Sequence, residues 1–352
     1  MEYIIAYCTG NFLELIYSKI RRPLEEILLS EKQELWIADL YNFLHGNCTL
    51  VTDLTHDEIL RRSTDSKALD FNPNFKKLWK NGKISVFSYP ETFAQMETDN
   101  GYFNGKTTEL FFIDRSEDFC IKVENTFGLV CSCPELMDKS IPRLFVFEIK
   151  SINKNGKVKS WDFLKNFRYP SNSAVVADNF ILKDEAIVHD NLFQIIQNIL
   201  PLHLVSSYDL TILTREVKDL DYMYNYINEY CLNSFPYKIN LSICIADLGR
   251  LGFHDRDIIT NNCLYYSGAG FGLFKRSNNG IVISDPTKVS IFPTTYTGHY
   301  STLISKNAEN APPVQDNYFS VLNTYKLIWK ELPDSIGLFK KFVGIRKNRL
   351  LD

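Results

Sequence analysis

The residues of this chain with the clearest capacity for chemistry lie between positions 253 and 276. His254, Asp255 and Arg256 form a polar run at the start of a predicted strand that closes on a turn at Asn261. A second strand, 263–266, would complete a hairpin. The segment that follows contributes three glycines and two cations, Gly268, Gly270, Gly272, Lys275 and Arg276. Glycines allow close backbone approach, and Arg and Lys donate to anions, so the pattern predicts an anion site.

Three roles for this segment stay open on the residues alone. His254 could act as a nucleophile on a phosphodiester, with Asp255 and Arg256 completing the catalytic group. The segment could also bind a phosphate, a nucleic-acid backbone or a partner carboxylate without catalysis, with these ligand-binding residues: Asn261, Gly268, Gly270, Gly272, Lys275 and Arg276. His254, Asp255 and Arg256 could instead hold the hairpin together through buried ion pairs. A dinucleotide-binding loop is excluded, because these glycines follow a hairpin instead of opening a βαβ helix.

His254 to Ile258, Thr260 to Asn262 and the glycine segment ending at Lys275 resemble the phospholipase D-like C-terminal domain of MIT-domain-containing proteins. The resemblance implies this fold over residues 142–310, and a domain that dimerises and binds acidic phosphoinositide head groups without catalysis. Active phospholipase D enzymes carry Lys and Asp where Arg256 and Asn261 stand here. Arg keeps the charge and grips phosphate bidentately, so the change favours binding over catalysis. No other histidine is followed two residues later by Lys or Arg, so a second active-site copy would require a homodimer.

A different enzyme class is suggested by Glu148 and Lys150, which resemble the strand-borne pair of metal-dependent nucleases, with Asp138 upstream as a companion carboxylate. Such a site would hold Mg²⁺ and place a lysine near the attacking water. The competing interpretation is an edge strand with a solvated Glu–Lys pair. Apart from Mg²⁺ in this nuclease alternative, we expect no cofactor.

The order of predicted elements places these residues in the second part of an α/β protein. At 352 residues the chain is long enough for two domains, and turn-forming residues at 134–142 suggest 1–140 and 141–352. Strands are predicted at 35–41, 49–54, 83–89, 109–114, 129–132, 144–149, 174–177, 210–213 and 239–246. Alternation with helices indicates α/β layers, with a mixed sheet flanked by helices in the second domain. Thr55 and Glu58 form a predicted capping box.

The bulk composition limits partners and location. A net charge of −3 argues against a surface that binds polyanions everywhere, although a local basic patch remains compatible with it. No signal peptide or transmembrane span is predicted, and scattered cysteines suggest a reducing compartment, so we expect a cytoplasmic protein. Expected partners are another protein or a second copy, or nucleic acid or another phosphate-bearing ligand. The basic tail at 340–349 is interpreted as a solvated terminus, or alternatively as a patch that contacts nucleic acid or an acidic membrane. A bacterial defence system against phage is a hypothesis by association.

Overall fold

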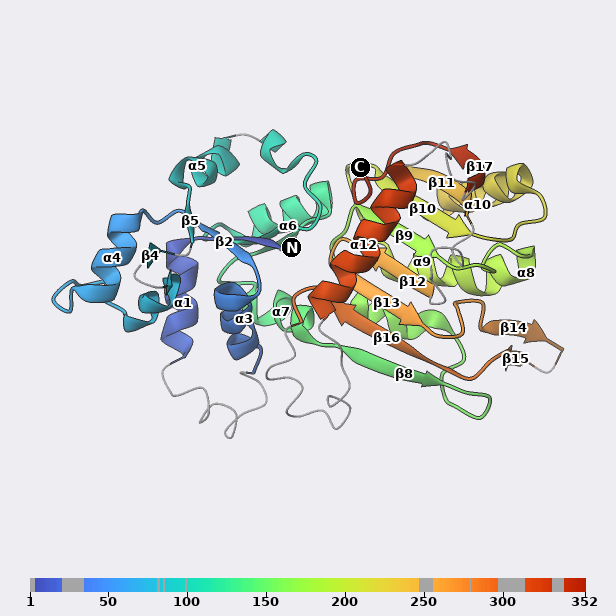
Figure 1. Ribbon diagram of the computed structural model, residues 1–352, viewed down its shortest axis with the longest axis horizontal. Coiled ribbons are helices and arrows are strands. Elements are labelled where there is room, and N and C mark those ends of the chain that lie inside the picture. Colours follow the sequence, from blue (N-terminus) through green and yellow to red (C-terminus); the bar gives the residue numbers. More distant parts are fainter. Residues whose placement is uncertain are drawn as a thin grey trace. The chain divides into compact units, whose positions relative to one another are not determined.

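The computed structural model describes residues 4–20, 35–80, 83–84, 86–98, 100–246, 256–278, 280–296, 314–330 and 339–352 (Figure 1). It shows an α/β protein that divides into two compact units. Unit 1 contains Met1–Glu124, Leu129–Val146 and Thr294–Asn317, and unit 2 contains Asn125–Gly128, Phe147–Pro293 and Tyr318–Asp352. Each unit has its own sheet.

The sheet of unit 1 is parallel throughout, in the order β5-β2-β1-β6-β7. Its strands are β1 (Ile5–Cys8), β2 (Thr49–Thr52), β5 (Phe87–Ser88), β6 (Leu110–Phe112) and β7 (Val130–Ser132). The helices of this unit are α1 (Gly10–Lys19), α3 (Leu35–Gly46), α4 (His56–Thr64), α5 (Pro90–Thr98), α6 (Glu117–Phe127, whose last turn belongs to unit 2) and α7 (Met137–Ser140). Short 3-10 turns occupy Pro73–Leu78, Asn100–Phe103 and Pro142–Phe145, and β3 (Trp79–Lys80) pairs with β4 (Lys83–Ile84).

Local signals account for part of unit 1 and mislead in two places. The predicted capping box is confirmed, because Thr55 and Glu58 satisfy each other's backbone donors at the start of α4. The predicted strand at 35–41 is wrong: these residues begin helix α3. Ile37, Leu40 and Tyr41 are buried and recur at helical spacing, but a window of seven apolar residues does not separate a buried strand from a buried helix. The predicted strand at 83–89 is interrupted, with β4 and β5 as its ends.

Unit 2 is built on a mixed eight-stranded sheet in the order β17-β11-β10-β9-β12-β13-β16-β8. Its strands are β8 (Glu148–Ile152), β9 (Ser173–Ala177), β10 (Tyr208–Thr214), β11 (Ile239–Ala246), β12 (Arg256–Thr260), β13 (Cys263–Ser267), β16 (Thr287–Pro293) and β17 (Phe339–Gly344). β9, β10 and β11 run parallel, and the other neighbours pair antiparallel. The strand predicted at 144–149 begins later, at Glu148, because Pro142–Phe145 forms a 3-10 turn.

The three parallel strands form the core of unit 2, and every residue in them is buried. Such continuous burial is expected of parallel strands that are covered on both faces. In Figure 1, α12 (Val314–Lys330) crosses one face, while α8 (Glu185–Ile187), α9 (Phe193–Ile199) and α10 (Leu220–Ser234) lie on the other. A π-helical turn, Val188–Leu192, joins α8 to α9, and a 3-10 helix, Trp161–Phe167, packs beside α9. A two-stranded hairpin, β14 (Phe274–Ser277) and β15 (Gly280–Ile283), stands outside the large sheet.

The last residues of the C-terminal tail are integrated into unit 2, although Arg346 and Lys347 just before them are exposed. Asn348 is fully buried and donates to the Ala174 carbonyl (3.1 Å) and the Thr211 hydroxyl (2.9 Å). Arg349 forms an ion pair with the buried carboxylate of Asp209, at 3.4 Å. The interpretation of 340–349 as a uniformly solvated basic tail is therefore wrong for its last residue.

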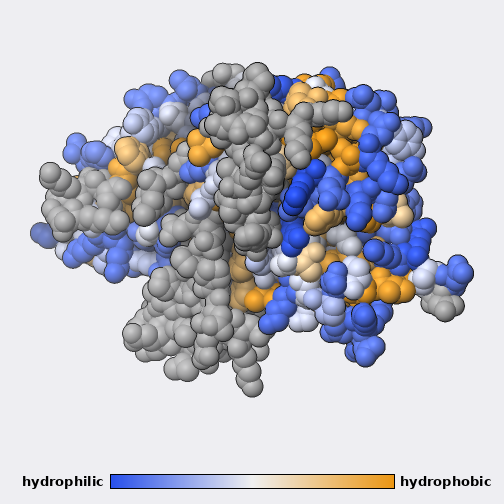
Figure 2. Space-filling view, turned by 45° about the vertical axis from the view of Figure 1, so that its right-hand side comes forward, coloured by the Kyte–Doolittle hydropathy of each residue, from blue (hydrophilic) through white to orange (hydrophobic). Residues whose placement is uncertain are grey.

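The described helices and surface residues bear on whether a helix could span a membrane. Among the described helices, none combines the length and the hydrophobicity that a bilayer span requires. On the face drawn in Figure 2, hydrophilic and apolar residues are intermixed. The exposed large apolar side chains of unit 2 include Val205 in a loop, Leu232 on α10 and Leu327 on α12.

Candidate functional site

The structure brings Arg256 and the first two glycines of the predicted site together. Arg256 opens β12 opposite Ser267 on β13, so its side chain reaches the glycine segment directly after that strand. One terminal nitrogen of Arg256 donates to the carbonyl of Gly268 at 2.9 Å. A Cβ placed on Gly270 would lie 3.6 Å from both Cδ and Nε of Arg256. This part of the predicted arrangement is local to one hairpin.

The third member of this cluster, Asp178, comes from the end of strand β9. Its carboxylate accepts from the backbone N–H of Phe271 (2.6 Å) and of Phe180 (2.8 Å). Gly270 has φ +90°, and a Cβ there would lie 2.8 Å from the Asp178 carboxylate. Glycine is required because the backbone is left-handed and because a carboxylate occupies the space of a side chain. The glycine segment is thus shaped around an internal carboxylate.

The charges of Arg256 and Asp178 balance each other in part. Asp178 is 2% exposed, and this burial raises the pKa of its carboxyl group. The hydrogen bonds from the N–H groups of Phe180 and Phe271 and the nearby Arg256 charge act in the opposite direction and lower that pKa, but by less than burial raises it. The Arg256 Nε is buried and has no hydrogen-bond partner among the described residues. His254 and Asp255, the predicted nucleophile and its neighbour, lie outside the described residues. In the described part of the cluster, the Arg256 side chain therefore lies near a buried carboxylate of the same unit.

The remaining predicted ligand-binding residues lie elsewhere in unit 2. Asn261 ends up at the other end of β12 from Arg256, fully buried, where its side-chain oxygen accepts from the backbone of Asn172 (2.9 Å) and Ser173 (3.0 Å). Lys275 and Arg276 are exposed on β14, and Arg276 pairs with Asp190 at 2.9 Å. Gly272 does not have a left-handed backbone, and a Cβ added to it would lie 3.3 Å from the Ile187 side chain. The predicted set is therefore divided among several places.

Two residues of the nuclease alternative lie on one strand of unit 2, whereas the third belongs to unit 1. Glu148 and Lys150 form an ion pair with each other on β8, which is an edge strand of the large sheet. Asp138 belongs to unit 1, is 69% exposed at its side chain, and pairs with Lys19 at 3.4 Å. In the parts of the chain that the structure describes, no group of three or more His, Cys, Asp and Glu side chains is placed to hold a metal ion. The edge-strand interpretation of the Glu–Lys pair agrees with this placement.

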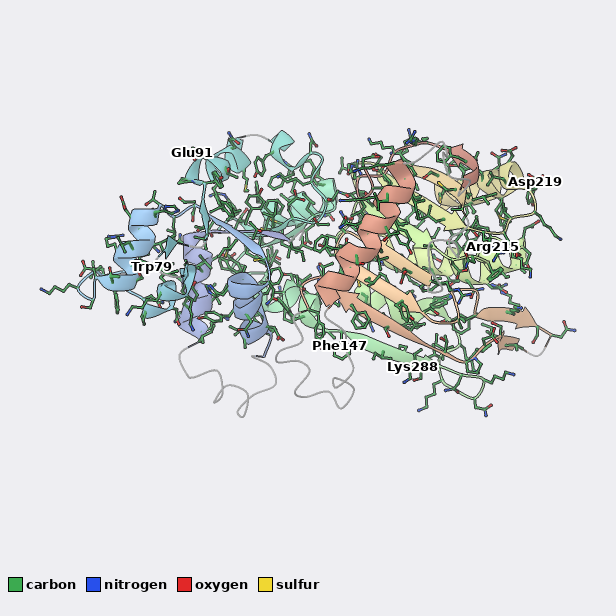
Figure 3. The ribbon with its side chains drawn as sticks, in the orientation of Figure 1. Trp79, Glu91, Phe147, Arg215, Asp219 and Lys288 are labelled. Carbon is green, nitrogen blue, oxygen red and sulfur yellow. The ribbon has the colours of Figure 1, made fainter. Side chains whose placement is uncertain are left out.

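A pocket that the sequence analysis missed lies at the carboxyl edge of the parallel strands. Its volume is about 490 Å³, and its lining comes from the loop after β9, the loop after β10 and the end of β11. The lining consists of Lys183, Arg215, Glu216, Val217, Lys218, Leu220 and Ile245. Figure 3 labels Arg215 and Asp219 in the β10–α10 loop. We call this the carboxyl-edge pocket.

The two loops that build the carboxyl-edge pocket are tied together by the backbone. The Asn179 carbonyl accepts from the N–H groups of Arg215 (3.3 Å) and Glu216 (3.1 Å). Asp219 then caps helix α10 by accepting from the Tyr222 N–H at 3.0 Å. The position of Arg215 is therefore fixed at its backbone, although its side chain is exposed.

The electrostatics of the carboxyl-edge pocket are predominantly positive. Lys183, Arg215 and Lys218 are exposed, and none of the three pairs with a carboxylate of a described residue. Glu216 is the one acidic side chain in the described lining, and Val217, Leu220 and Ile245 add an apolar surface. The sequence did contain a signal, since Arg215 lies two positions after predicted strand 210–213 and Lys183 lies six positions after predicted strand 174–177. In α/β sheets, ligands bind outside the carboxyl ends of such strands.

The comparisons with known proteins do not assign the chain to a family. No family model matches it, and no curated protein matches it. The phospholipase D-like resemblance around His254 therefore stays a prediction.

Proposed function

We propose that unit 2 is a binding module for a phosphate-bearing ligand, which it holds in the carboxyl-edge pocket. The observation that carries this proposal is the convergence of Lys183, Arg215 and Lys218 on one pocket without a carboxylate partner among the described residues. Three cations beside a single acidic residue, Glu216, favour an anion, and Arg offers a planar set of donors that matches phosphate oxygens.

The size and lining of the pocket suit a ligand larger than a free phosphate ion. Its volume of about 490 Å³ lies within the range of small-molecule sites. Val217, Leu220 and Ile245 give the ligand an apolar surface, and Glu216 can accept a hydrogen bond from a hydroxyl or amino group. A nucleotide-sized phosphate ester combines these features, with the phosphate on the cations.

Unit 2 would bind the phosphate-bearing ligand without cleaving it, and an activity assay separates this function from hydrolysis of a phosphodiester. The described lining supplies positive charge, a carboxylate and apolar contacts, while His254, the predicted nucleophile, lies outside the described residues. A metal-independent phosphodiesterase whose activity disappears in His254→Ala would support the enzyme interpretation instead. The phospholipase D-like identity, assembly with a partner or second copy, and a role in phage defence are further predictions of ours. Neighbouring genes and the mass of the protein in solution would test them.

Calorimetry with ATP and with adenosine tests the proposed function. ATP should bind and adenosine should bind at least tenfold more weakly, because the cations act on the phosphates. Arg215→Gln with Lys218→Gln should weaken ATP binding at least tenfold and reduce its dependence on salt concentration. Lys238→Gln serves as the control, because Lys238 is exposed beside the start of β10, at the opposite edge of the same sheet.

Two results would contradict the proposed function. One is an ATP affinity that stays the same when Arg215 and Lys218 lose their charges. The other is an equal loss in Lys238→Gln, which would show that general surface charge, and not this pocket, attracts the nucleotide.

A further inference from the structure

The β14–β15 hairpin is clamped to the body of unit 2 by one buried asparagine. The side-chain oxygen of Asn191 accepts from the Phe274 N–H (2.8 Å), and its amide donates to the Phe274 carbonyl (2.9 Å). The same oxygen accepts from the indole N–H of Trp161 at 3.1 Å, and Asn191 is 0% exposed. These bonds fix the start of β14, although β14 and β15 form a sheet of only two strands.

The neighbouring residue, Asp190, holds the same strand two residues further on. One carboxylate oxygen accepts from the backbone N–H of Arg276 (2.9 Å), and the other accepts from its Nε (2.9 Å). In a regular α-helix the side chains of consecutive residues point about 100° apart, which works against hydrogen bonds from both of them to one strand. Here Asp190 and Asn191 lie in the π-helical turn Val188–Leu192, which alters that spacing. Such turns often mark functional sites.

The grip of Asp190 orients the guanidinium group of Arg276. The Asp190 side chain is 9% exposed, whereas that of Arg276 is 67% exposed. Asp190 bonds Nε, and the two terminal nitrogens of Arg276, the fork of the guanidinium group, have no hydrogen-bond partner among the described residues. A charged fork held in place by a nearly buried carboxylate is a pre-organised donor for an oxyanion, since less rotamer freedom is lost on binding.

Other basic and polar groups surround this fork. A pocket of about 130 Å³ is lined by Lys159, Ser160, Asp190, Gln194, Phe274, Lys275, Arg276 and Ile281. Lys275 is exposed and forms no ion pair with a described residue. Lys159 is held by its own loop, where its ammonium donates to the Lys154 carbonyl at 2.8 Å. Three cations therefore face one carboxylate, Asp190, which is already bonded to Arg276.

We propose that the π-turn and the β14–β15 hairpin form a second anion site, which takes the dianionic phosphate of a phosphomonoester. Its donors are the terminal nitrogens of Arg276, the ammonium groups of Lys275 and Lys159, and the amide of Gln194. The pocket volume of about 130 Å³ is several times the ~30 Å³ that one molecule occupies in liquid water, so the pocket has room for a tetrahedral oxyanion. This site shares no lining residue with the carboxyl-edge pocket and does not depend on the function proposed for that pocket.

The test uses the full chain carrying Arg215→Gln and Lys218→Gln, so that the carboxyl-edge pocket contributes little to the measured binding of the phosphorylated ligand. A dinucleotide with a 5′-phosphate, the same dinucleotide with a 5′-hydroxyl, and inorganic phosphate are titrated by calorimetry. The phosphorylated dinucleotide should bind at least tenfold more tightly than its hydroxyl form. Inorganic phosphate should compete with it, which separates recognition of the phosphate from recognition of the dinucleotide.

Variants of the hairpin then locate the binding. Lys275→Gln and Arg276→Gln should each weaken binding at least fivefold, and Arg276→Lys should recover only part of the loss, because lysine lacks the fork. Lys288→Gln, an exposed lysine on β16 outside the pocket lining, should leave binding unchanged.

Two outcomes would overturn the second site. Equal affinity for the two dinucleotides would point to the phosphodiester backbone. Unchanged binding in Lys275→Gln, whose side chain is exposed and forms no ion pair with a described residue, would remove the hairpin from the site. Because Arg215 and Lys218 are already altered in this protein, neither result bears on the carboxyl-edge pocket.

Discussion

Replacing Gly270 by alanine tests whether the glycine segment is shaped by Asp178. An alanine at φ +90° adopts a left-handed backbone, at a cost of about 1–3 kcal/mol. Its Cβ would also lie 2.8 Å from the Asp178 carboxylate, which must move away. That movement would sacrifice the 2.6 Å bond from the Phe271 N–H, and a hydrogen bond to a charged group contributes about 1.5–3 kcal/mol. Together these two effects predict that Gly270→Ala lowers the free energy of unfolding by about 2.5–6 kcal/mol.

Gly268→Ala, two residues earlier, is the matched control. The nearest atom to an added Cβ is the Thr287 hydroxyl at 3.8 Å, and the backbone of Gly268 is not left-handed. Alanine there should change the free energy of unfolding by at most about 1 kcal/mol, in the stabilising direction, because it restricts the unfolded chain. Urea unfolding followed by tryptophan fluorescence measures both variants. Similar stabilities for Gly270→Ala and Gly268→Ala would refute the assignment of Asp178 as the group that shapes this loop.

Two further predictions concern stability in each unit. In unit 1, burial raises the pKa of Glu124 from its usual 4.5 to about 7, although the charge of Arg143 and the hydrogen bond from the Cys131 N–H both act to lower it. The folded protein holds this proton more tightly than the unfolded chain, so this group's contribution to the unfolding free energy falls between pH 4.5 and 7, by about 3 kcal/mol. Glu124→Gln should therefore match the parent protein at pH 4 and exceed its stability by about that amount at pH 8; a difference independent of pH in urea unfolding would contradict this. In unit 2, Asn348→Ala should cost about 1–3 kcal/mol, because the Ala174 carbonyl and the Thr211 hydroxyl lose a buried donor; an unchanged thermal midpoint would show that the tail contributes no stability.

Several elements could be predicted because their signals are local. The apolar runs 174–177, 210–213 and 239–246 predicted the three central strands, and these became β9, β10 and β11. The Asn261–Asn262 pair predicted the turn between β12 and β13, whose register pairs Thr260 with Cys263. A run of apolar residues or a turn pair constrains the backbone within a few residues, so these features needed no knowledge of distant contacts.

The candidate site was predicted only where it depends on neighbours in the sequence. Arg256 and Gly268 were expected together because one hairpin connects them, and the structure joins them by a hydrogen bond. Asn261 was expected beside them, but successive residues along a strand are about 3.3 Å apart, so the length of β12 separates Asn261 from Arg256. No local signal placed Asp178 against Phe271, which follows it by 93 positions.

The amino-acid sequence by itself determined the α/β class, the central strands, the hairpin that carries Arg256 and the presence of Arg215 just after one of the central strands. Tertiary structure alone decided that Lys183, Arg215 and Lys218 share a pocket, that Asp178 fills the space beside Gly270, and that a π-turn orients Arg276. The physical reason is that periodicity and turn chemistry act over a few residues, whereas these contacts depend on which strand ends meet at one edge. That order is set by the pairing of β9, β10, β11 and β12, which extends over 80 residues and more of the chain.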